Sequence, residues 1–285
     1  MNTPILLKRR LIDRLRKAGL LMQVDYVRYL ADYLRTRSEN RRIEAANPEI
    51  RFPPSYLAYD AYSSCAHAWY LETGRNAAQA IWKLLAPWLA GPGHGNPALV
   101  VEWGCGPARI IRHLPAVCER SDIRFIGTDY NRKTIAWCKD SVSGIGFEHN
   151  GLTPPLPMPD ASVDALYCVS VFTHLSEEMH FAWIAEIARV LRPGGIVLMA
   201  LNGDRFIPTL GDAERAGYES GELVVRGNVL EGSRTYLAFH PPAFVRDKLL
   251  AGLEVLVHET NPDPHISSGQ DIWIARRPLP GSGPG

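Results

Sequence analysis

A glycine turn follows an apolar run in the middle of the chain. Residues 99–103 are apolar except for one acid, Glu102, and Gly104 and Gly106 come directly after them. Glycine lets a backbone turn sharply and approach a ligand that a Cβ atom would push away. Pro107 is typical of a first helical turn, where its missing N–H group leaves no hydrogen bond unmade. The stretch therefore predicts a buried strand, a ligand-binding turn and the N-terminus of a helix.

Two histidines are candidate general bases. His174 follows an apolar run in the sequence FTHL, and His240 stands in FHPP. Histidine titrates near neutral pH, so its side chain is suited to take a proton from a reacting hydroxyl group. A histidine in such a loop also serves as a purely structural hydrogen-bonding group. The sequence leaves both roles open for both residues.

The composition is that of a globular protein without a membrane span. Of the 285 residues, 46% are hydrophobic and 21% are charged, which is ordinary for a soluble domain. No apolar run is long enough to cross a bilayer. The first residues are interrupted by charge, so we do not expect a secretory signal.

The cysteines predict free thiols rather than a disulfide frame. The five cysteines are odd in number and form no CxxC pair, which fits a reducing, cytoplasmic location. Cys105 and Cys168 are interpreted as small buried side chains and not as nucleophiles. No spacing of His, Cys, Asp or Glu calls for a metal, so we expect none.

Strand and helix patterns alternate from the glycine turn onward. The predicted strands are residues 99–103, 123–128, 144–149, 163–171, 196–201, 253–258 and 271–275, and the predicted helices between them include 132–142, 176–191 and 241–250. Asp129 comes directly after the second of these strands. Alternation at this spacing predicts an α/β fold, with a mostly parallel sheet and helices on both faces.

The remaining segments extend this core. Residues 1–50 predict a basic helical arm broken at Gly19, 51–97 a helical lead-in, 202–240 an insertion after the fifth strand, and 278–285 a disordered tail. Long ordered insertions at the edge of such a sheet are usually functional, so 202–240 is expected on the substrate side.

Charge is concentrated in the arm. Residues 1–42 hold eleven Lys or Arg and four Asp or Glu, which leaves the rest of the chain acidic because the whole chain has a net charge of +1. Basic amphipathic helices pack on their own domain, pair with a second copy, or lie on an anionic membrane surface. Nucleic acid is a weaker alternative, because no RNA-binding module is present and we expect no DNA partner.

The motifs together resemble those of class I S-adenosylmethionine-dependent methyltransferases. The stretches that carry the resemblance are VVEWGCGPAR, FIGTDYN, NGLTPPLP, DALYCVSVFTHL and VLRPGGIVLMAL. Two residues depart from the family pattern, since Trp103 replaces a smaller aliphatic residue and Ala108 replaces a third glycine. The resemblance covers residues 98–277 and implies a Rossmann-like, seven-stranded sheet with the N-terminal arm and the insertion added to it.

The resemblance also implies a role for each motif residue at the strand ends. The backbone of the glycine turn would approach the methionine and ribose, Glu102 would orient that turn or reach the ammonium through water, and Asp129 would bind the ribose hydroxyls. Tyr130 would cover the adenine. The full set of expected cofactor-binding residues is Glu102, Gly104, Cys105, Gly106, Asp129, Tyr130, Asn150, Gly151, Leu152, Val169 and Ser170. Glu102 as a turn cap and Asp129 as a helix cap are the structural alternatives.

The resemblance favours S-adenosylmethionine-dependent methyl transfer to a hydroxyl group. The expected acceptor is a polar small molecule or a glycan, with His174 or His240 as base. An RNA or protein methyltransferase, a non-catalytic S-adenosylmethionine-binding scaffold and an NAD-dependent oxidoreductase remain alternatives. The last is disfavoured because Arg109 stands where the dinucleotide fingerprint has its third glycine.

Overall fold

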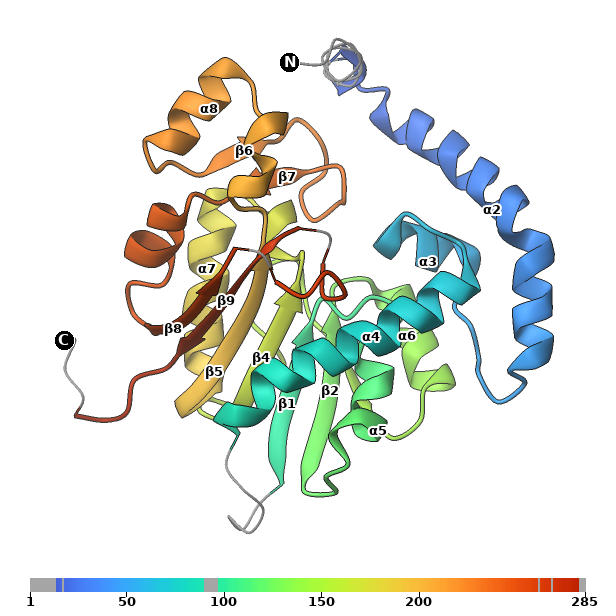
Figure 1. Ribbon diagram of the computed structural model, residues 1–285, viewed down its shortest axis with the longest axis horizontal. Coiled ribbons are helices and arrows are strands. Elements are labelled where there is room, and N and C mark those ends of the chain that lie inside the picture. Colours follow the sequence, from blue (N-terminus) through green and yellow to red (C-terminus); the bar gives the residue numbers. More distant parts are fainter. Residues whose placement is uncertain (1–13, 17, 90–96, 261, 268, 282–285) are drawn as a thin grey trace.

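The computed structural model describes residues 14–16, 18–89, 97–260, 262–267 and 269–281 (Figure 1). Most of the basic stretch before Gly19, the loop 90–96 and the end of the predicted tail lie outside the described residues. No helix in the described part of the chain is both long and apolar enough to cross a membrane.

The core is a seven-stranded sheet in the order β3-β2-β1-β4-β5-β9-β8. Its strands are β1 Ala98–Trp103, β2 Ile123–Asp129, β3 Gly146–His149, β4 Val163–Val169, β5 Leu191–Leu201, β8 Glu254–Glu259 and β9 Asp271–Arg276. The first five run parallel, and β9 is antiparallel to both of its neighbours. The predicted fold class is confirmed: this is a Rossmann-like α/β sheet.

Helices cover both faces of the sheet (Figure 1). They are α2 Leu21–Ala46, α3 Ser55–Tyr62, α4 His67–Leu85, α5 Leu114–Cys118, α6 Arg132–Ser141, α7 Glu177–Val190 and α8 Asp212–Glu219, with short helical turns at η1 Ala86–Trp88, η2 Ile111–His113, η3 Phe172–His174, η4 Asp204–Thr209 and η5 Phe244–Leu249. One hydrophobic core joins α4, α5 and α6 to the sheet, and a second joins α7 and η5 to its other face. Strands buried on both faces are mostly apolar, and β1 and β4 each carry a single acid, Glu102 and Asp164.

The helix predicted at Pro107 does not form. The chain continues as turns to η2, and Ala108 has a φ of 55°. A left-handed residue cannot continue a right-handed helix, so the helical residues begin only at Ile111. Pro115 stands in the first turn of α5 and does not close a helix.

Several predicted boundaries differ from the structure. The stretch 193–195 was expected to separate helix from strand, but β5 already begins at Leu191 and pairs with β4 across an irregularity between Val163 and Ala165. The helix predicted over 241–250 has its regular part in η5, a π-helix. A π-helical turn is rare and has no sequence pattern of its own.

The insertion forms a small unit above the carboxyl ends of the strands. It holds η4, α8 and a two-stranded sheet of β6 Val224–Arg226 and β7 Leu237–Phe239. The sequence favours short strands over 222–225 and 235–239, and both exist, as β6 and β7, and pair with each other. The helices η4 and α8 had not been predicted.

Candidate functional site

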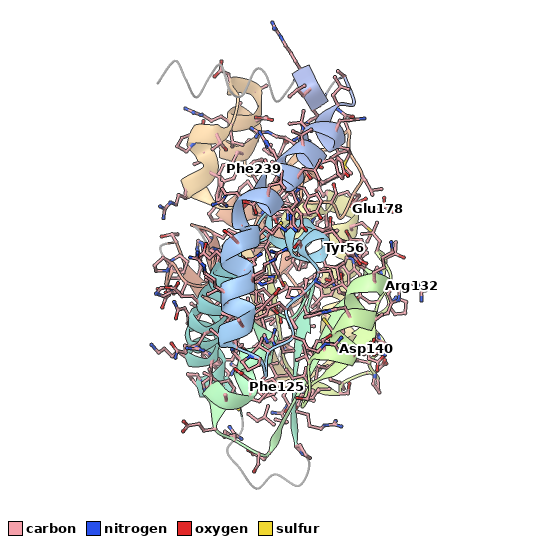
Figure 2. The ribbon with its side chains drawn as sticks, turned by 90° about the vertical axis from the view of Figure 1, so that its right-hand side faces the viewer. Tyr56, Phe125, Arg132, Asp140, Glu178 and Phe239 are labelled. Atoms are coloured by element: carbon pink, nitrogen blue, oxygen red, sulfur yellow. The ribbon has the colours of Figure 1, made fainter. Side chains whose placement is uncertain are left out.

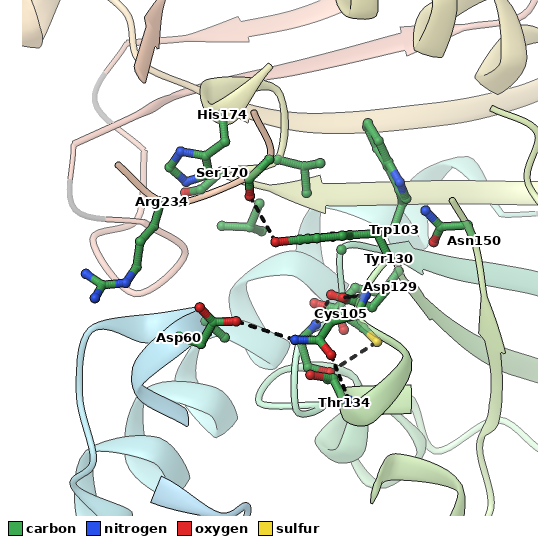
Figure 3. Close-up of a pocket in the computed structure, with 18 of the residues that line it drawn as sticks. Asp60, Trp103, Cys105, Asp129, Tyr130, Thr134, Asn150, Ser170, His174 and Arg234 are labelled. Atoms are coloured by element: carbon green, nitrogen blue, oxygen red, sulfur yellow. Dashed lines mark hydrogen bonds between the residues drawn. The ribbon is translucent and has the colours of Figure 1, made fainter. Parts of the chain in front are cut away.

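A pocket lies at the carboxyl ends of β1, β2 and β4, between α3 and the insertion (Figure 3). All eleven residues expected to bind a cofactor line it: Glu102, Gly104, Cys105, Gly106, Asp129, Tyr130, Asn150, Gly151, Leu152, Val169 and Ser170. Open α/β sheets bind ligands at this edge. The structure therefore brings the predicted residues together from four separate stretches of the chain.

The turn after β1 forms one wall of the pocket. The N–H groups of Gly104 and Cys105 both donate to the Thr128 carbonyl, at 2.8 and 2.9 Å. Gly104 has a φ of 75°, and a Cβ atom there would lie 2.3 Å from Cγ2 of Val171. Both its conformation and its surroundings require glycine at this position.

Glu102 holds this turn from below. Its Oε2 accepts the N–H of Ile111 at 3.1 Å, and its side chain is buried at 3% exposure. Burial raises the pKa of Glu102 to about 8, although hydrogen bonding to Tyr167 and the nearby Arg109 charge oppose that rise. This geometry is that of a residue that orients the turn and the start of η2.

Asp129 stands at the centre of the pocket floor. Its Oδ2 accepts the N–H of Gly106 at 2.9 Å, and its Oδ1 accepts the N–H of Asn131 at 2.8 Å. Burial raises the pKa of Asp129 to about 6. Asp129 is not the cap of α6, because the Asn131 side chain accepts the N–H groups of Lys133 and Thr134. Each carboxylate oxygen retains capacity for a further donor.

Tyr130 and Asn150 border the next part of the pocket. The Tyr130 side chain is 42% exposed and extends across the pocket in Figure 3, and its hydroxyl donates to the Gly232 carbonyl at 3.3 Å. The Asn150 amide donates to the Gly151 carbonyl at 2.7 Å. Its Oδ1 is buried and accepts no hydrogen bond from the described residues. A buried acceptor of this kind calls for a donor from a ligand.

The end of β4 forms the opposite wall. Ser170 has a φ of 62°, and its hydroxyl donates to Oε1 of Gln270 at 2.8 Å. Its carbonyl accepts the Thr173 hydroxyl at 2.6 Å. Gln270 in turn donates to Oδ1 of Asn202. The position of Ser170 is thus fixed by Gln270, from the segment before β9, which is itself held by Asn202, the residue directly after β5.

The segment 230–236, here called the roof loop, closes part of the pocket from above. The N–H of Gly232 donates to the His174 carbonyl at 2.9 Å, and Oε1 of Glu231 accepts the N–H of Ser176. Arg234 forms an ion pair with Asp25 of α2 and lies over the ring of Tyr59, its guanidinium carbon 4.6 Å from the centroid. The roof loop therefore connects the pocket to the arm.

His174 lines the pocket, with its ring tautomer fixed by the roof loop. Its Nδ1 lies 2.7 Å from the Tyr236 carbonyl. Because a carbonyl can accept a hydrogen bond but cannot donate one, Nδ1 carries the proton. Nε2 is then left with a lone pair. Burial lowers the pKa of His174 below its ordinary 6.5, which keeps the ring neutral near pH 7.

His240 does not reach the pocket, so its assignment as a base in contact with an acceptor is wrong. It is 1% exposed, and its Nε2 lies 2.8 Å from Nε2 of His180. Burial is the main reason that the pKa of His240 lies well below 6.5. Its N–H donates to Asn202 and its carbonyl accepts the Tyr218 hydroxyl. His240 is a structural residue at the end of the insertion.

Sequence reasoning missed six polar residues of the pocket, of which Asn131 and Thr134 belong to the start of α6. Asp60 and Tyr62 come from α3, whose sequence shows no clear period, and Arg109 and Arg234 come from loops. The Arg109 guanidinium lies over the rings of Tyr62 and Trp69, at 5.3 and 5.2 Å. Burial raises the pKa of Tyr62 well above 10. Only the position of Arg109 beside the glycine turn pointed to the site.

Trp103 and Cys105 are also part of the pocket. Trp103 packs against Trp183 and Phe172, with ring centroids 4.4 and 5.2 Å apart, so it fills the core as well as facing the site. Cys105 and Cys168 are buried, and burial raises the pKa of both thiols. Neither is therefore an activated nucleophile. No group of three His, Cys, Asp or Glu side chains in the described part of the chain is arranged to hold a metal.

Known proteins share the region that carries these residues. Residues 101–199 match the model of a family described as a methyltransferase domain. A probable S-adenosylmethionine-dependent methyltransferase of Mycolicibacterium smegmatis is 36% identical over 101 residues, which are 35% of this chain and 37% of that relative. A tRNA N(3)-methylcytidine methyltransferase of Schizosaccharomyces pombe is 25% identical over 48% of this chain and 46% of its own. The chain thus spans less than half the length of these curated relatives.

A solved structure shares the fold over more of the chain. One chain of a complex between the Trm112 methyltransferase activator and a methyltransferase of Haloferax volcanii has a TM-score of 0.51 and 16% sequence identity. The match covers 80% of this chain and all of that chain. At this identity the likeness shows the fold.

The pocket fits S-adenosylmethionine. The unpartnered Oδ1 of Asn150 matches the donor that the amino group of an adenine supplies. Asp129 offers acceptors for a ribose diol. The neighbouring turn has no side chain at Gly104, where a Cβ atom would occupy the space beside Val171. Residues 101–199, which carry most of this pocket, are therefore similar to a methyltransferase domain, and the groups around the pocket suit S-adenosylmethionine as its cofactor.

Proposed function

We propose that this protein transfers a methyl group from S-adenosylmethionine to a hydroxyl group of a polar small molecule or a glycan. When bound, S-adenosylmethionine supplies a methyl group already activated by its sulfonium. Asp129, Asn150 and the turn at Gly104 hold it, and the acceptor enters beside His174. An alcohol must lose a proton as it is methylated, so a nearby base is useful.

The geometry of His174 carries this proposal. The 2.7 Å contact of its Nδ1 with the Tyr236 carbonyl fixes the tautomer and leaves Nε2 to take the hydroxyl proton. The lowered pKa of His174 keeps Nε2 available as a base at neutral pH. The burial of Trp103, Trp183 and Leu175 around the pocket limits water at the reacting centre.

An RNA acceptor is the second candidate, because one relative is by name a tRNA methyltransferase. The pocket presents the carboxyl group of Asp60, whose pKa is raised by burial, while Arg234 is already paired with Asp25. A carboxyl group at the mouth of the pocket does not favour a polyanion. We therefore place a neutral polar acceptor first.

The decisive experiment is a turnover screen. The protein is incubated with S-adenosylmethionine and one candidate acceptor at a time, and release of S-adenosylhomocysteine is measured. The acceptors are nucleotide sugars, glycans, phenols and tRNA. Turnover with a hydroxyl acceptor that is lost in His174→Gln supports the proposal. Turnover with tRNA alone would replace it, and cofactor binding without any turnover would favour a scaffold.

A further inference from the structure

Helix α2 is held on the molecule by polar side chains on its inner side. Thr36 and Asn40 are its buried residues. The Asn40 amide donates to the Cys65 carbonyl at 2.7 Å and accepts the N–H of His67 at 2.9 Å, and Oδ2 of Asp32 accepts the N–H of Cys65 at 2.7 Å. Hydrogen bonds to the segment before α4 therefore hold α2 on the molecule, together with the ring contact of Tyr29 with Tyr59.

The opposite side of the helix is apolar and exposed. Leu20, Val27, Leu30 and Leu34 recur at spacings of three, four and seven residues, with exposed fractions of 45%, 64%, 39% and 67%. At 3.6 residues per turn these positions share one side of the helix. Six of the thirteen large exposed hydrophobic side chains among the described residues fall between positions 20 and 34. Figure 2 shows α2 crossing the front of the molecule.

The same side becomes cationic toward the end of the helix. Arg37 and Arg41 lie seven residues after Leu30 and Leu34, so they continue the apolar row. Both are exposed, and neither forms an ion pair with another described residue. The acids of the helix are directed elsewhere: Asp25 is paired with Arg234, Asp32 with Arg35 and the Cys65 N–H, and Glu44 lies 3.3 Å from His67 Nδ1. Glu39, two residues from each arginine, lies on another side of the helix. We call these six residues, Leu20, Val27, Leu30, Leu34, Arg37 and Arg41, the outer face of α2.

A second copy of the chain fits this face poorly. Parallel pairing would place Arg37 and Arg41 beside the same arginines of the other copy. Antiparallel pairing would give the arginines no acidic partner at the start of the helix, because residues 18–24 hold no Asp or Glu. Like charges held together at an interface oppose association. A partner with a negatively charged surface above an apolar interior avoids this repulsion.

We propose that the outer face of α2 docks on an anionic membrane surface. Apolar side chains of an amphipathic helix enter the boundary between headgroups and acyl chains, and arginines pair with anionic headgroups. Tyr26, 60% exposed at the edge of the face, is of a type that is enriched at this boundary. The docked helix lies in the plane of the surface, and the methyltransferase domain stays in water.

Vesicle binding tests the proposal without an acceptor or turnover. The full chain is sedimented with vesicles of phosphatidylcholine alone and with an equal mixture of phosphatidylcholine and phosphatidylglycerol. Binding is expected only to the mixture, and added salt is expected to weaken it because salt screens the arginines. The double variant Val27→Asp, Leu34→Asp and the double variant Arg37→Gln, Arg41→Gln should each bind at least about tenfold more weakly.

Matched controls carry the same changes elsewhere. Leu279→Asp alters an exposed leucine near the C-terminal end, and Arg132→Gln alters an exposed arginine of α6. Both should bind the mixed vesicles as the parent chain does, and circular dichroism should show that every variant folds. The proposal is overturned if the outer-face variants bind unchanged, if neutral vesicles bind equally, or if no vesicle binds. It also fails if sedimentation in buffer shows a dimer that the Val27→Asp, Leu34→Asp variant abolishes, since a second copy then covers the face.

Discussion

Asp129 combines two features that rarely occur together in a carboxylate. Both of its oxygens accept backbone N–H groups, yet burial still raises its pKa to about 6. Desolvation of the charged form therefore outweighs the two hydrogen bonds. A ligand that donates further hydrogen bonds to the ionised carboxylate lowers that pKa again, so binding and ionisation favour each other.

Replacing Asp129 should weaken cofactor binding. We expect Asp129→Ala to lose about 1–3 kcal/mol of binding free energy for S-adenosylhomocysteine, because ribose hydroxyls are left without acceptors. Titration calorimetry measures the change. An unchanged dissociation constant would remove Asp129 from the site.

The affinity should also depend on pH through this group. The carboxylate is ionised above a pH of about 6 and protonated below it. Binding of S-adenosylhomocysteine is therefore expected to be constant above that pH and to weaken as the pH falls through it. In Asp129→Asn the affinity should be lower and its pH dependence flatter. The same steep dependence in the variant would assign the titration to another group.

His174 gives a prediction for the chemical step. With a hydroxyl acceptor, we expect His174→Gln to lower kcat by roughly 10²–10⁴-fold while the affinity for S-adenosylhomocysteine stays the same. Because the neutral ring is the base and its pKa is lowered, kcat should rise with pH and level off below pH 6.5. His240→Gln is the contrast: it should lower Tm, since His180 loses its buried partner, and leave kcat of the folded protein intact.

At the level of elements, the β1 turn sets the position of the site. Gly104, Gly106 and Ala108 all have positive φ values, so three residues within five leave the right-handed region. Glu102 and the Thr128 carbonyl supply the hydrogen bonds that hold this backbone. The conformation of this turn therefore depends on its hydrogen-bond partners, Glu102 and the Thr128 carbonyl, as well as on its own residues.

A glycine substitution tests this turn against a matched position. Gly104→Ala combines a φ of 75° with a Cβ 2.3 Å from Val171, so it should lower Tm and weaken binding of S-adenosylhomocysteine. Gly144 has a φ of 76° and nothing within 4 Å of an added Cβ. Gly144→Ala should therefore cost only about 1 kcal/mol of stability and leave binding unchanged. Equal effects on binding would show that the close approach to Val171 is unimportant.

The elements differ in how far their sequences determine them. The strands were predictable because β1, β4 and β5 are apolar runs bounded by breakers, and the pocket residues followed because parallel strands end at one edge. The prediction of a helix at Pro107 was wrong because Ala108 adopts a left-handed conformation. Alanine favours the right-handed helix, so its presence in the sequence gives no sign of that conformation. His240 was misplaced because its partner, His180, is distant in sequence. Asp60 and Tyr62 reach the pocket only through the packing of α3, which no local pattern encodes.

At the level of the whole molecule, the arm and the insertion are joined above the pocket. Arg16 donates to the carbonyls of Arg226, Gly227 and Thr235, and Arg234 pairs with Asp25 and donates to Ser63. Parts of the chain more than two hundred residues apart thus stabilise each other. Neither segment belongs to the seven-stranded sheet.

A double-mutant cycle measures this connection. We expect Asp25→Ala and Arg234→Ala to show a coupling free energy of about 1 kcal/mol in urea unfolding, because the pair is partly buried and lies near the ring of Tyr59. Additive effects of the two changes would show that the ion pair does not join the arm to the insertion.

The hydrogen bond from Tyr130 to Gly232 has a kinetic consequence. An adenosine that enters or leaves along this side must pass the roof loop, and a Cβ at Gly232 would already lie 2.6 Å from Leu152. With adenosine bound beneath the roof loop, as proposed above, we expect release of S-adenosylhomocysteine to require that this loop opens. Arg234 connects that loop to α2 through its ion pair with Asp25. Immobilising the arm should therefore slow exchange of the cofactor without changing where the bound cofactor lies in the pocket.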